Sequence, residues 1–169
     1  RDGRLMVSKD QGTTWTADSL DEASSLLPTK FAFASWPLAT NDSTDYQLLI
    51  GTNDQNSTAC VVWRKLAEYA SGSEPSKWVY IPMESYNVYY LPKMENLNLL
   101  RYKGHILAIG DNGKIYESRD KGITWKTNKA FTLPSELTAY HLSAATDDNG
   151  YLWIKSLDDN SVWRGFLIE

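Results

Sequence analysis

An eight-residue pattern that occurs twice constrains the fold of this chain more than any other feature. Residues 8–15 read SKDQGTTW, and residues 118–125 read SRDKGITW. The shared positions are Ser8, Asp10, Gly12, Thr14 and Trp15 in the first octet and Ser118, Asp120, Gly122, Thr124 and Trp125 in the second. Agreement over so long a separation indicates that the chain is built from a repeated structural unit.

The rest of the chain is typical of strands rather than helices. Short runs of aromatic and β-branched residues alternate with Gly, Asn and Asp, and helical periodicity is scarce. Three stretches repeat one order, a Leu-Pro pair followed by three such runs. We therefore expect strands at residues 31–36, 46–51 and 60–65, at residues 97–102, 105–110 and 114–118, and at residues 140–145, 151–155 and 161–165. A fourth strand is expected near residues 77–80, after the longest loop, at residues 70–76.

The spacing of equivalent positions predicts the architecture. Met6, Trp63, Tyr116 and Trp163 fall on successive third strands, 57, 53 and 47 residues apart. A period of about fifty residues with four strands is typical of the blade of a β-propeller. The sequence thus predicts an all-β fold, a partial β-propeller of about 3.5 four-stranded blades in a single segment. The expected blade parts are residues 1–26, 27–90, 91–132 and 133–169.

Each octet falls in the turn between a third and a fourth strand, and there it resembles the Asp-box, or bacterial neuraminidase repeat, S-x-D-x-G-x-T-W. We expect the Asp carboxylate to accept hydrogen bonds from its own turn and the Gly to adopt a positive φ. The Trp is expected to fold over the hairpin and bury apolar area, in like surroundings in both octets. The resemblance implies a structural role for the octets. It also implies a likeness to bacterial secreted or surface propellers, and hence an extracytoplasmic location.

The expected strands are too few to close a propeller, which has about four to eight blades. We therefore expect the chain to be the C-terminal part of a larger propeller. The remaining blades would be further segments or a second copy of the chain. As an alternative, the first and last blades join into a small four-bladed ring.

Asp-box proteins include sialidases and other glycan-cleaving hydrolases, but this chain does not match their catalytic residues. Tyr80-Ile81-Pro82 lacks the arginine of the Arg-Ile-Pro motif that sialidases carry. Among the scattered arginines, only Arg101 lies on an expected first strand. The acidic pairs Asp147-Asp148 and Asp158-Asp159 fall in turn contexts, where solvated loops explain them better than a glycosidase pair does. No catalytic residue is therefore assigned.

Other site chemistries are absent from the sequence. Cys60 lies in an apolar run, which favours a buried thiol over a nucleophile. His105 and His141 lack the spacing of a metal site, and there is no phosphate-binding loop. The net charge of −4 gives no bias toward nucleic acid, and no apolar stretch reaches membrane-spanning length. We predict no cofactor and no metal.

One aromatic cluster is a candidate binding surface, formed by Trp78, Tyr80, Tyr86, Tyr89 and Tyr90. Such side chains stack on sugars or anchor a protein partner, although a fourth strand and blade linker that pack against a neighbouring blade explain them better. The favoured hypothesis is a non-catalytic binding or scaffolding module for a protein or glycan. The alternative is part of a glycan-active hydrolase whose other active-site residues lie in other blades. That hydrolase would direct acids or Arg101 toward the central channel.

Overall fold

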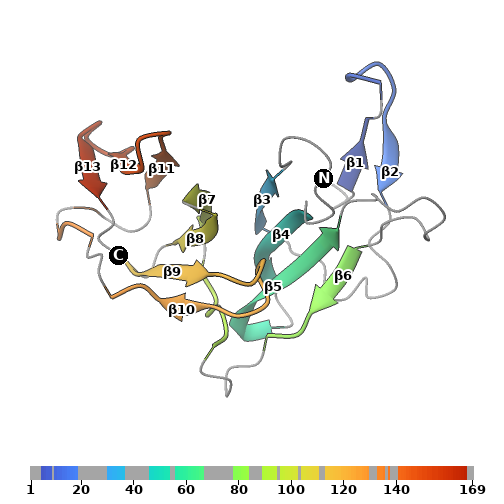
Figure 1. Ribbon diagram of the computed structural model, residues 1–169, viewed down its shortest axis with the longest axis horizontal. Coiled ribbons are helices and arrows are strands. Elements are labelled where there is room, and N and C mark those ends of the chain that lie inside the picture. Colours follow the sequence, from blue (N-terminus) through green and yellow to red (C-terminus); the bar gives the residue numbers. More distant parts are fainter. Residues whose placement is uncertain are drawn as a thin grey trace.

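The described part of the chain contains thirteen β-strands and no helix (Figure 1). The computed structural model describes residues 5–8, 10–18, 30–36, 46–53, 56–66, 78–83, 89–94, 96–102, 104–110, 113–129, 133–135, 137 and 141–166. The prediction of an all-β fold is confirmed. The loop at residues 70–76 and Tyr86 lie outside the described residues.

The strands form four antiparallel sheets in which each strand pairs with its neighbours along the chain. The first sheet is the hairpin of β1 (Leu5–Val7) and β2 (Thr16–Asp18). The second contains β3 (Lys30–Trp36), β4 (Tyr46–Asn53), β5 (Asn56–Leu66) and β6 (Trp78–Ile81). The third contains β7 (Asn98–Tyr102), β8 (His105–Ile109), β9 (Ile115–Ser118) and β10 (Lys126–Thr127). The fourth contains β11 (Leu142–Thr146), β12 (Tyr151–Ser156) and β13 (Val162–Phe166).

All nine strands expected in the three repeated stretches are present, as is the fourth strand near residue 78. The largest difference between an expected strand and the observed one is at the start of β5. This strand begins at Asn56 because the β4–β5 hairpin continues past a register shift to the pair Asn53↔Asn56. The four equivalent positions lie on β1, β5, β9 and β13, which are the strands expected to be third in their blades. Met6, Trp63, Tyr116 and Trp163 therefore occupy corresponding strands of successive sheets.

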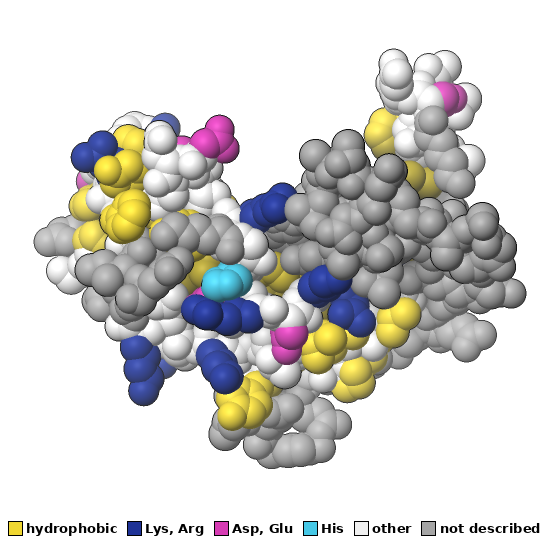
Figure 2. Space-filling view, in the orientation of Figure 1, with side chains coloured by type: hydrophobic (Ala, Val, Ile, Leu, Met, Phe, Trp, Pro, Cys, Tyr) yellow, Lys and Arg dark blue, Asp and Glu magenta, His cyan; other side chains and the backbone are white. Residues whose placement is uncertain are grey.

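The sheets follow one another along an open arc (Figure 1). The β1–β2 hairpin lies at one end of the arc, and the sheet of β11, β12 and β13 lies at the other. In the space-filling view, hydrophobic side chains gather on the left, over the fourth sheet, and a small hydrophobic area is visible near the β1–β2 hairpin, at the upper right (Figure 2). The exposed side chains there include Met6, Val162 and Phe166.

Two apolar clusters hold the second, third and fourth sheets face to face. Between the second and third sheets lie Leu48 and Ile50 from β4, Ile106 and Ala108 from β8, and Trp125. The third and fourth sheets meet through a cluster formed chiefly by Leu100, Leu107, Ile109, Leu152 and Ile154. Strand β8 contributes alternate side chains to both clusters, so it is covered on both faces, and this explains why its sequence is almost entirely apolar.

The single cysteine is part of this interior. Cys60 is fully buried, and its Sγ donates a hydrogen bond to the carbonyl oxygen of Pro92 at 3.2 Å. The prediction of a buried thiol is confirmed.

We expect Leu107→Ala to lower the free energy of unfolding by about 2–5 kcal/mol, because it leaves a cavity between the third and fourth sheets. Urea denaturation followed by circular dichroism measures this change. Val79 is 54% exposed, so Val79→Ala serves as the control and should change the free energy by less than about 0.5 kcal/mol. Equal effects of the two substitutions would contradict the assignment of Leu107 to the interior.

Candidate functional site

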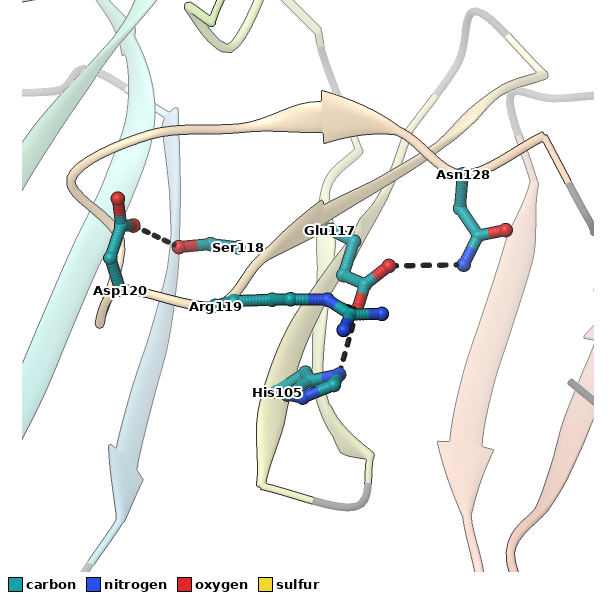
Figure 3. Close-up of polar contacts among 6 residues, drawn as sticks. All are labelled: His105, Glu117, Ser118, Arg119, Asp120 and Asn128. Atoms are coloured by element: carbon teal, nitrogen blue, oxygen red, sulfur yellow. Dashed lines mark hydrogen bonds and ion pairs between the residues drawn. The ribbon is translucent and has the colours of Figure 1, made fainter. Parts of the chain in front are cut away.

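Each octet folds around the carboxylate of its aspartate. In the second octet, the hydroxyl of Ser118 and the backbone N–H of Thr124 both donate to Oδ1 of Asp120, at 2.9 and 2.8 Å. The hydroxyl of Thr124 donates to Oδ2 at 2.5 Å. The N–H of Gly122 donates to Ser118 Oγ at 2.9 Å, and the indole of Trp125 donates to the carbonyl of Gly122 at 3.1 Å. Figure 3 shows Ser118 turned toward Asp120 at the end of β9.

The first octet repeats these hydrogen bonds one for one. Ser8 and the N–H of Thr14 donate to Oδ1 of Asp10, both at 2.8 Å, and the Thr14 hydroxyl donates to Oδ2 at 2.6 Å. The other two bonds, from Gly12 N–H to Ser8 Oγ and from the Trp15 indole to the Gly12 carbonyl, measure 2.7 and 3.1 Å. Gly12 and Gly122 have φ values of 92° and 86°, a region that glycine adopts without steric cost.

These donors stabilise the ionised carboxylates. The hydroxyl and N–H of Thr14, with the hydroxyl of Ser8, lower the pKa of Asp10 to about 2. Burial raises the pKa of Asp120, but the donors from Thr124 and Ser118 together outweigh burial, so the net shift is downward. Both aspartates are therefore anionic at neutral pH and serve as acceptors for their own turns.

The packing of the two octets differs. Trp125 is 1% exposed and belongs to the cluster between the second and third sheets, whereas Trp15 is 60% exposed. A Cβ on Gly122 would lie 2.9 Å from Cδ2 of Leu48 on β4, so the second octet sits directly on the second sheet. A Cβ on Gly12 would meet no atom within 4 Å. The expectation of like surroundings is thus wrong for the tryptophans, because only the second octet has a neighbouring sheet to cover it in the described part of the chain.

A second polar cluster lies beside the second octet (Figure 3). Oε1 of Glu117 accepts from His105 Nδ1 at 2.7 Å and from Arg119 Nε at 2.8 Å, while Asn128 Nδ2 donates to Oε2 at 3.3 Å. The sequence gives no sign of this contact, because only the β8–β9 register brings His105 to Glu117. These contacts link β8, β9 and the residue after β10. The described residues contain no group of three or more side chains suited to hold a metal ion.

A polar pocket of about 380 Å³ lies between the turn that joins β7 to β8 and the turn that joins β11 to β12. Its lining residues are Arg101, Tyr102, Gly104, Thr146, Asp147, Asp148 and Gly150. The two turns are held together because the Thr146 hydroxyl donates to the Arg101 carbonyl at 2.6 Å. The side-chain amide of Asn98 on β7 reinforces this contact, donating to the Leu142 carbonyl and accepting from the Ala144 N–H, both at 3.3 Å on β11.

The charged side chains of the pocket differ in whether they make hydrogen bonds within the protein. Oδ1 of Asp147 accepts from the N–H groups of Asn149 and Tyr151 at 2.9 and 3.0 Å, and Oδ2 accepts from the indole of Trp153 at 2.8 Å. The Trp153 indole first, and then the Tyr151 N–H, lower the pKa of Asp147. Arg101 and Asp148 are exposed, and within the described residues their side chains make no hydrogen bond or ion pair. The pocket therefore offers one guanidinium and one carboxylate to a ligand.

The sequence indicates only some of the features of this pocket. The sequence places Arg101 on an expected first strand, and it predicts solvated turns at Asp147 and Asp148. Turn residues at Gly104 and Gly150 predict two tight turns. Nothing in the sequence indicates that these turns face each other across two sheets.

The predicted aromatic surface is not formed by its described members. Trp78 is buried, and Tyr80 packs against Trp63 with ring centroids 5.4 Å apart, on the face of β6 away from the third sheet. Tyr90 contacts the cluster between the second and third sheets. Among the described members only Tyr89 is classed as exposed, at 43%, and Lys126 Nζ lies 4.9 Å from its ring centroid. Trp78 and Tyr80 share one face of β6, whereas Tyr89 and Tyr90 lie outside any strand, and Tyr90 contacts a different cluster.

Antiparallel four-stranded meanders packed face to face along an arc define the class of β-propeller domains. A comparison with protein families gives the same class. The chain belongs to the family described as the DUF6242 beta propeller domain, which matches residues 1–169. No curated protein and no solved structure matches the chain. No helix in the described ranges is long and apolar enough to cross a membrane.

We expect the same substitution to have unequal effects in the two octets. Asp120→Ala leaves the buried hydroxyl of Ser118 and the donors of Thr124 without their acceptor, and should lower the free energy of unfolding by about 1–3 kcal/mol. Asp10→Ala, in the exposed octet, should lower it less. Urea denaturation of both variants measures the difference. An Asp10 variant as unstable as the Asp120 variant would show that packing on the second sheet is unimportant.

The lowered pKa of Asp120 predicts a pH dependence of stability. Its folded pKa lies below the unfolded value of about 3.9, so the ionised group stabilises the fold above that pH. This contribution is lost as the pH falls toward the folded pKa. Asp120→Asn should therefore reduce the loss of unfolding free energy between about pH 7 and about pH 3, as measured by urea denaturation at each pH. A variant with the wild-type pH dependence would contradict this role.

Proposed function

We propose that this domain is a non-catalytic binding module and that its two octets are Asp-boxes with a structural role. Support for the Asp-box assignment comes from the five matched hydrogen bonds in each turn and from the two positive-φ glycines. Because each aspartate is engaged by its own turn, neither octet offers a reactive group to a ligand.

The pocket at Arg101 is the observation that carries the binding function. Its volume of about 380 Å³ lies within the range of about 300–1,000 Å³ that is typical of ligand sites. Arg101 presents hydrogen-bond donors and Asp148 presents acceptors. Gly104 and Gly150 add no side chain that would block the approach to the backbone. A ligand rich in hydroxyl groups matches this chemistry, since each hydroxyl both donates and accepts, and we propose a glycan.

Glycoside hydrolysis has weaker support than binding. A hydrolase of this kind requires two carboxyl groups, of which the general acid has a raised pKa. The pKa of Asp147 is lowered, and its oxygens are engaged by three donors. Only Asp148 is then available in the pocket. The alternative function, part of a glycan-active hydrolase, is favoured by the position of Arg101 on β7 and would require a second acid from elsewhere.

An extracytoplasmic location is part of the proposal. It rests on the likeness of the octets to those of bacterial secreted and surface propellers.

The test is binding of the domain to a glycan array, followed by calorimetric titration with the glycans retained. Arg101→Ala and Asp148→Asn should each weaken binding about tenfold or more, because each removes a charge-assisted hydrogen bond. Lys129→Ala removes an exposed charge outside the pocket and should leave affinity unchanged.

Two results would contradict the proposal. Retention of glycans that is insensitive to both pocket substitutions would place binding elsewhere on the domain. Turnover of chromogenic glycosides that is abolished by Asp148→Asn would favour the hydrolase.

A further inference from the structure

The polar cluster beside the second octet contains a carboxylate that the octet itself does not need. The first octet makes the same five hydrogen bonds with Val7 before its serine, whereas the second octet has Glu117 at that position. Glu117 is therefore not required by the fold of an octet. The third sheet, which carries it, packs against a sheet on each side, so the cluster does not lie at either end of the row of sheets.

Glu117 holds an imidazole and a guanidinium side by side (Figure 3). Its Oε1 accepts from His105 Nδ1 at 2.7 Å and from Arg119 Nε at 2.8 Å. Its Oε2 accepts from Asn128 Nδ2 at 3.3 Å. The side chain of Glu117 is 14% exposed, whereas those of His105 and Arg119 are 29% and 69% exposed. A shielded carboxylate thus orients two groups that solvent reaches, which is how a binding site is preorganised.

Cross-linking of strands accounts for two of these contacts but not for the third. His105 lies on β8 and Asn128 follows β10, so their bonds to Glu117 join neighbouring strands. Arg119 is only two residues from Glu117 along the chain, and its bond joins no further strand. An exposed ion pair of this kind contributes little to stability. The position of Arg119 is therefore better explained by contact with a ligand.

Both oriented groups keep atoms for a ligand. Within the described residues, the Nη atoms of Arg119 and Nε2 of His105 make no hydrogen bond or ion pair. The two Nη groups form a fork of N–H donors that matches two oxygens of a carboxylate, sulfate or phosphate. Because Nδ1 donates to Glu117, Nε2 of the neutral ring is an acceptor, which suits a sugar hydroxyl. The pair therefore fits an acidic group with a hydroxyl beside it.

The positive charge of the chain is concentrated around this cluster. Residues 91–132 contain eight of the 17 Lys and Arg residues but only four of the 21 Asp and Glu residues. The net charge of this segment is therefore positive, although that of the whole chain is −4. Figure 2 shows Lys and Arg side chains, in dark blue, around a histidine in the lower middle of the view. A positive segment in an acidic chain draws anionic ligands to one place.

The cluster continues from the pocket at Arg101. Tyr102 lines that pocket and pairs with His105 across the β7–β8 hairpin. His105 shares a face of the third sheet with Leu107, which packs toward the fourth sheet, and the pocket lies between turns of the same two sheets. Strand β9 is two strands away from β7, so its end lies about 10 Å from β7. A ligand longer than one sugar unit therefore reaches from the pocket to Arg119.

We propose that the glycan bound by this domain is acidic and that Arg119 and His105 bind its anionic part. The guanidinium of Arg119 binds the carboxylate, sulfate or phosphate group, and Nε2 of His105 accepts from a hydroxyl beside it. This inference rests on the proposed glycan binding and narrows it to one class of glycan.

The first experiment titrates each glycan retained by an array, before and after its acidic groups are esterified or removed. Neutralisation should weaken binding about tenfold or more, because a charge-assisted bidentate contact is lost. Arg119→Ala should weaken binding of the acidic form to the same extent and leave binding of the neutral form unchanged. Arg119→Lys, which keeps the charge without the fork, should have a smaller effect. Lys155→Ala removes an exposed charge on β12, outside the cluster and the pocket, and should change neither affinity.

The second experiment tests the anion site without a glycan. The chain has two histidines, His105 and His141. Titration with inorganic sulfate at constant ionic strength, followed by nuclear magnetic resonance, should shift the ring signals of His105 and leave those of His141 unchanged. Arg119→Ala should abolish the shift. Thermal unfolding by circular dichroism verifies that each variant folds.

The possible failures are distinguishable. Retention of neutral glycans alone, or affinity for acidic glycans that survives Arg119→Ala, would overturn this inference and leave the proposed glycan binding intact. A sulfate-dependent shift at His105 in a domain that retains no glycan would overturn the proposed function and show that the site takes its anion from another source. The absence of any shift at His105 would contradict the assignment of the anion site.

Discussion

The seating of the second octet on the second sheet is the contact on which the rest of the structure depends. Trp125, Leu48 and the side chains around them join two meanders that are each only four strands wide. Such a sheet has two apolar faces and cannot bury both by itself. Stacking covers them, and this is why strand β8 contributes to two clusters at once. The hydrophobic effect, rather than any single hydrogen bond, therefore sets the order of the sheets.

The polar features depend on this stacking in turn. The pocket exists because hydrogen bonds of Asn98 and Thr146 join β7 to β11, and this brings two turns to one place. Within it, Asp147 supports its own turn and Asp148 remains available. The same division is found in the octets, where the aspartates act on the backbone. In this domain Asp10, Asp120 and Asp147, which sequence patterns single out, each accept hydrogen bonds from their own turn.

The domain is also asymmetric in a way that its repeats do not suggest. Two turns with matching hydrogen bonds bury their tryptophans to opposite extents, 1% and 60% exposed. A turn of this kind is formed by bonds within eight residues, so it needs no neighbour. The burial of its tryptophan needs an apolar sheet against it. The presence of a neighbouring sheet therefore decides whether the tryptophan of an octet is buried.

The sequence by itself determined the strands, their order and the propeller class, because alternation, turn residues and the octets are local signals that act over a few residues. It also determined the buried state of Cys60, from the apolar run around it. Only the tertiary structure decided that Glu117 meets His105, that Arg101 and Asp148 line one pocket, and that Trp78 and Tyr89 lie apart. These relations depend on strand register and on the stacking of sheets, which join residues far apart in the chain. No local sequence pattern predicts these contacts, because the free energy that stabilises them comes from apolar area buried between whole sheets.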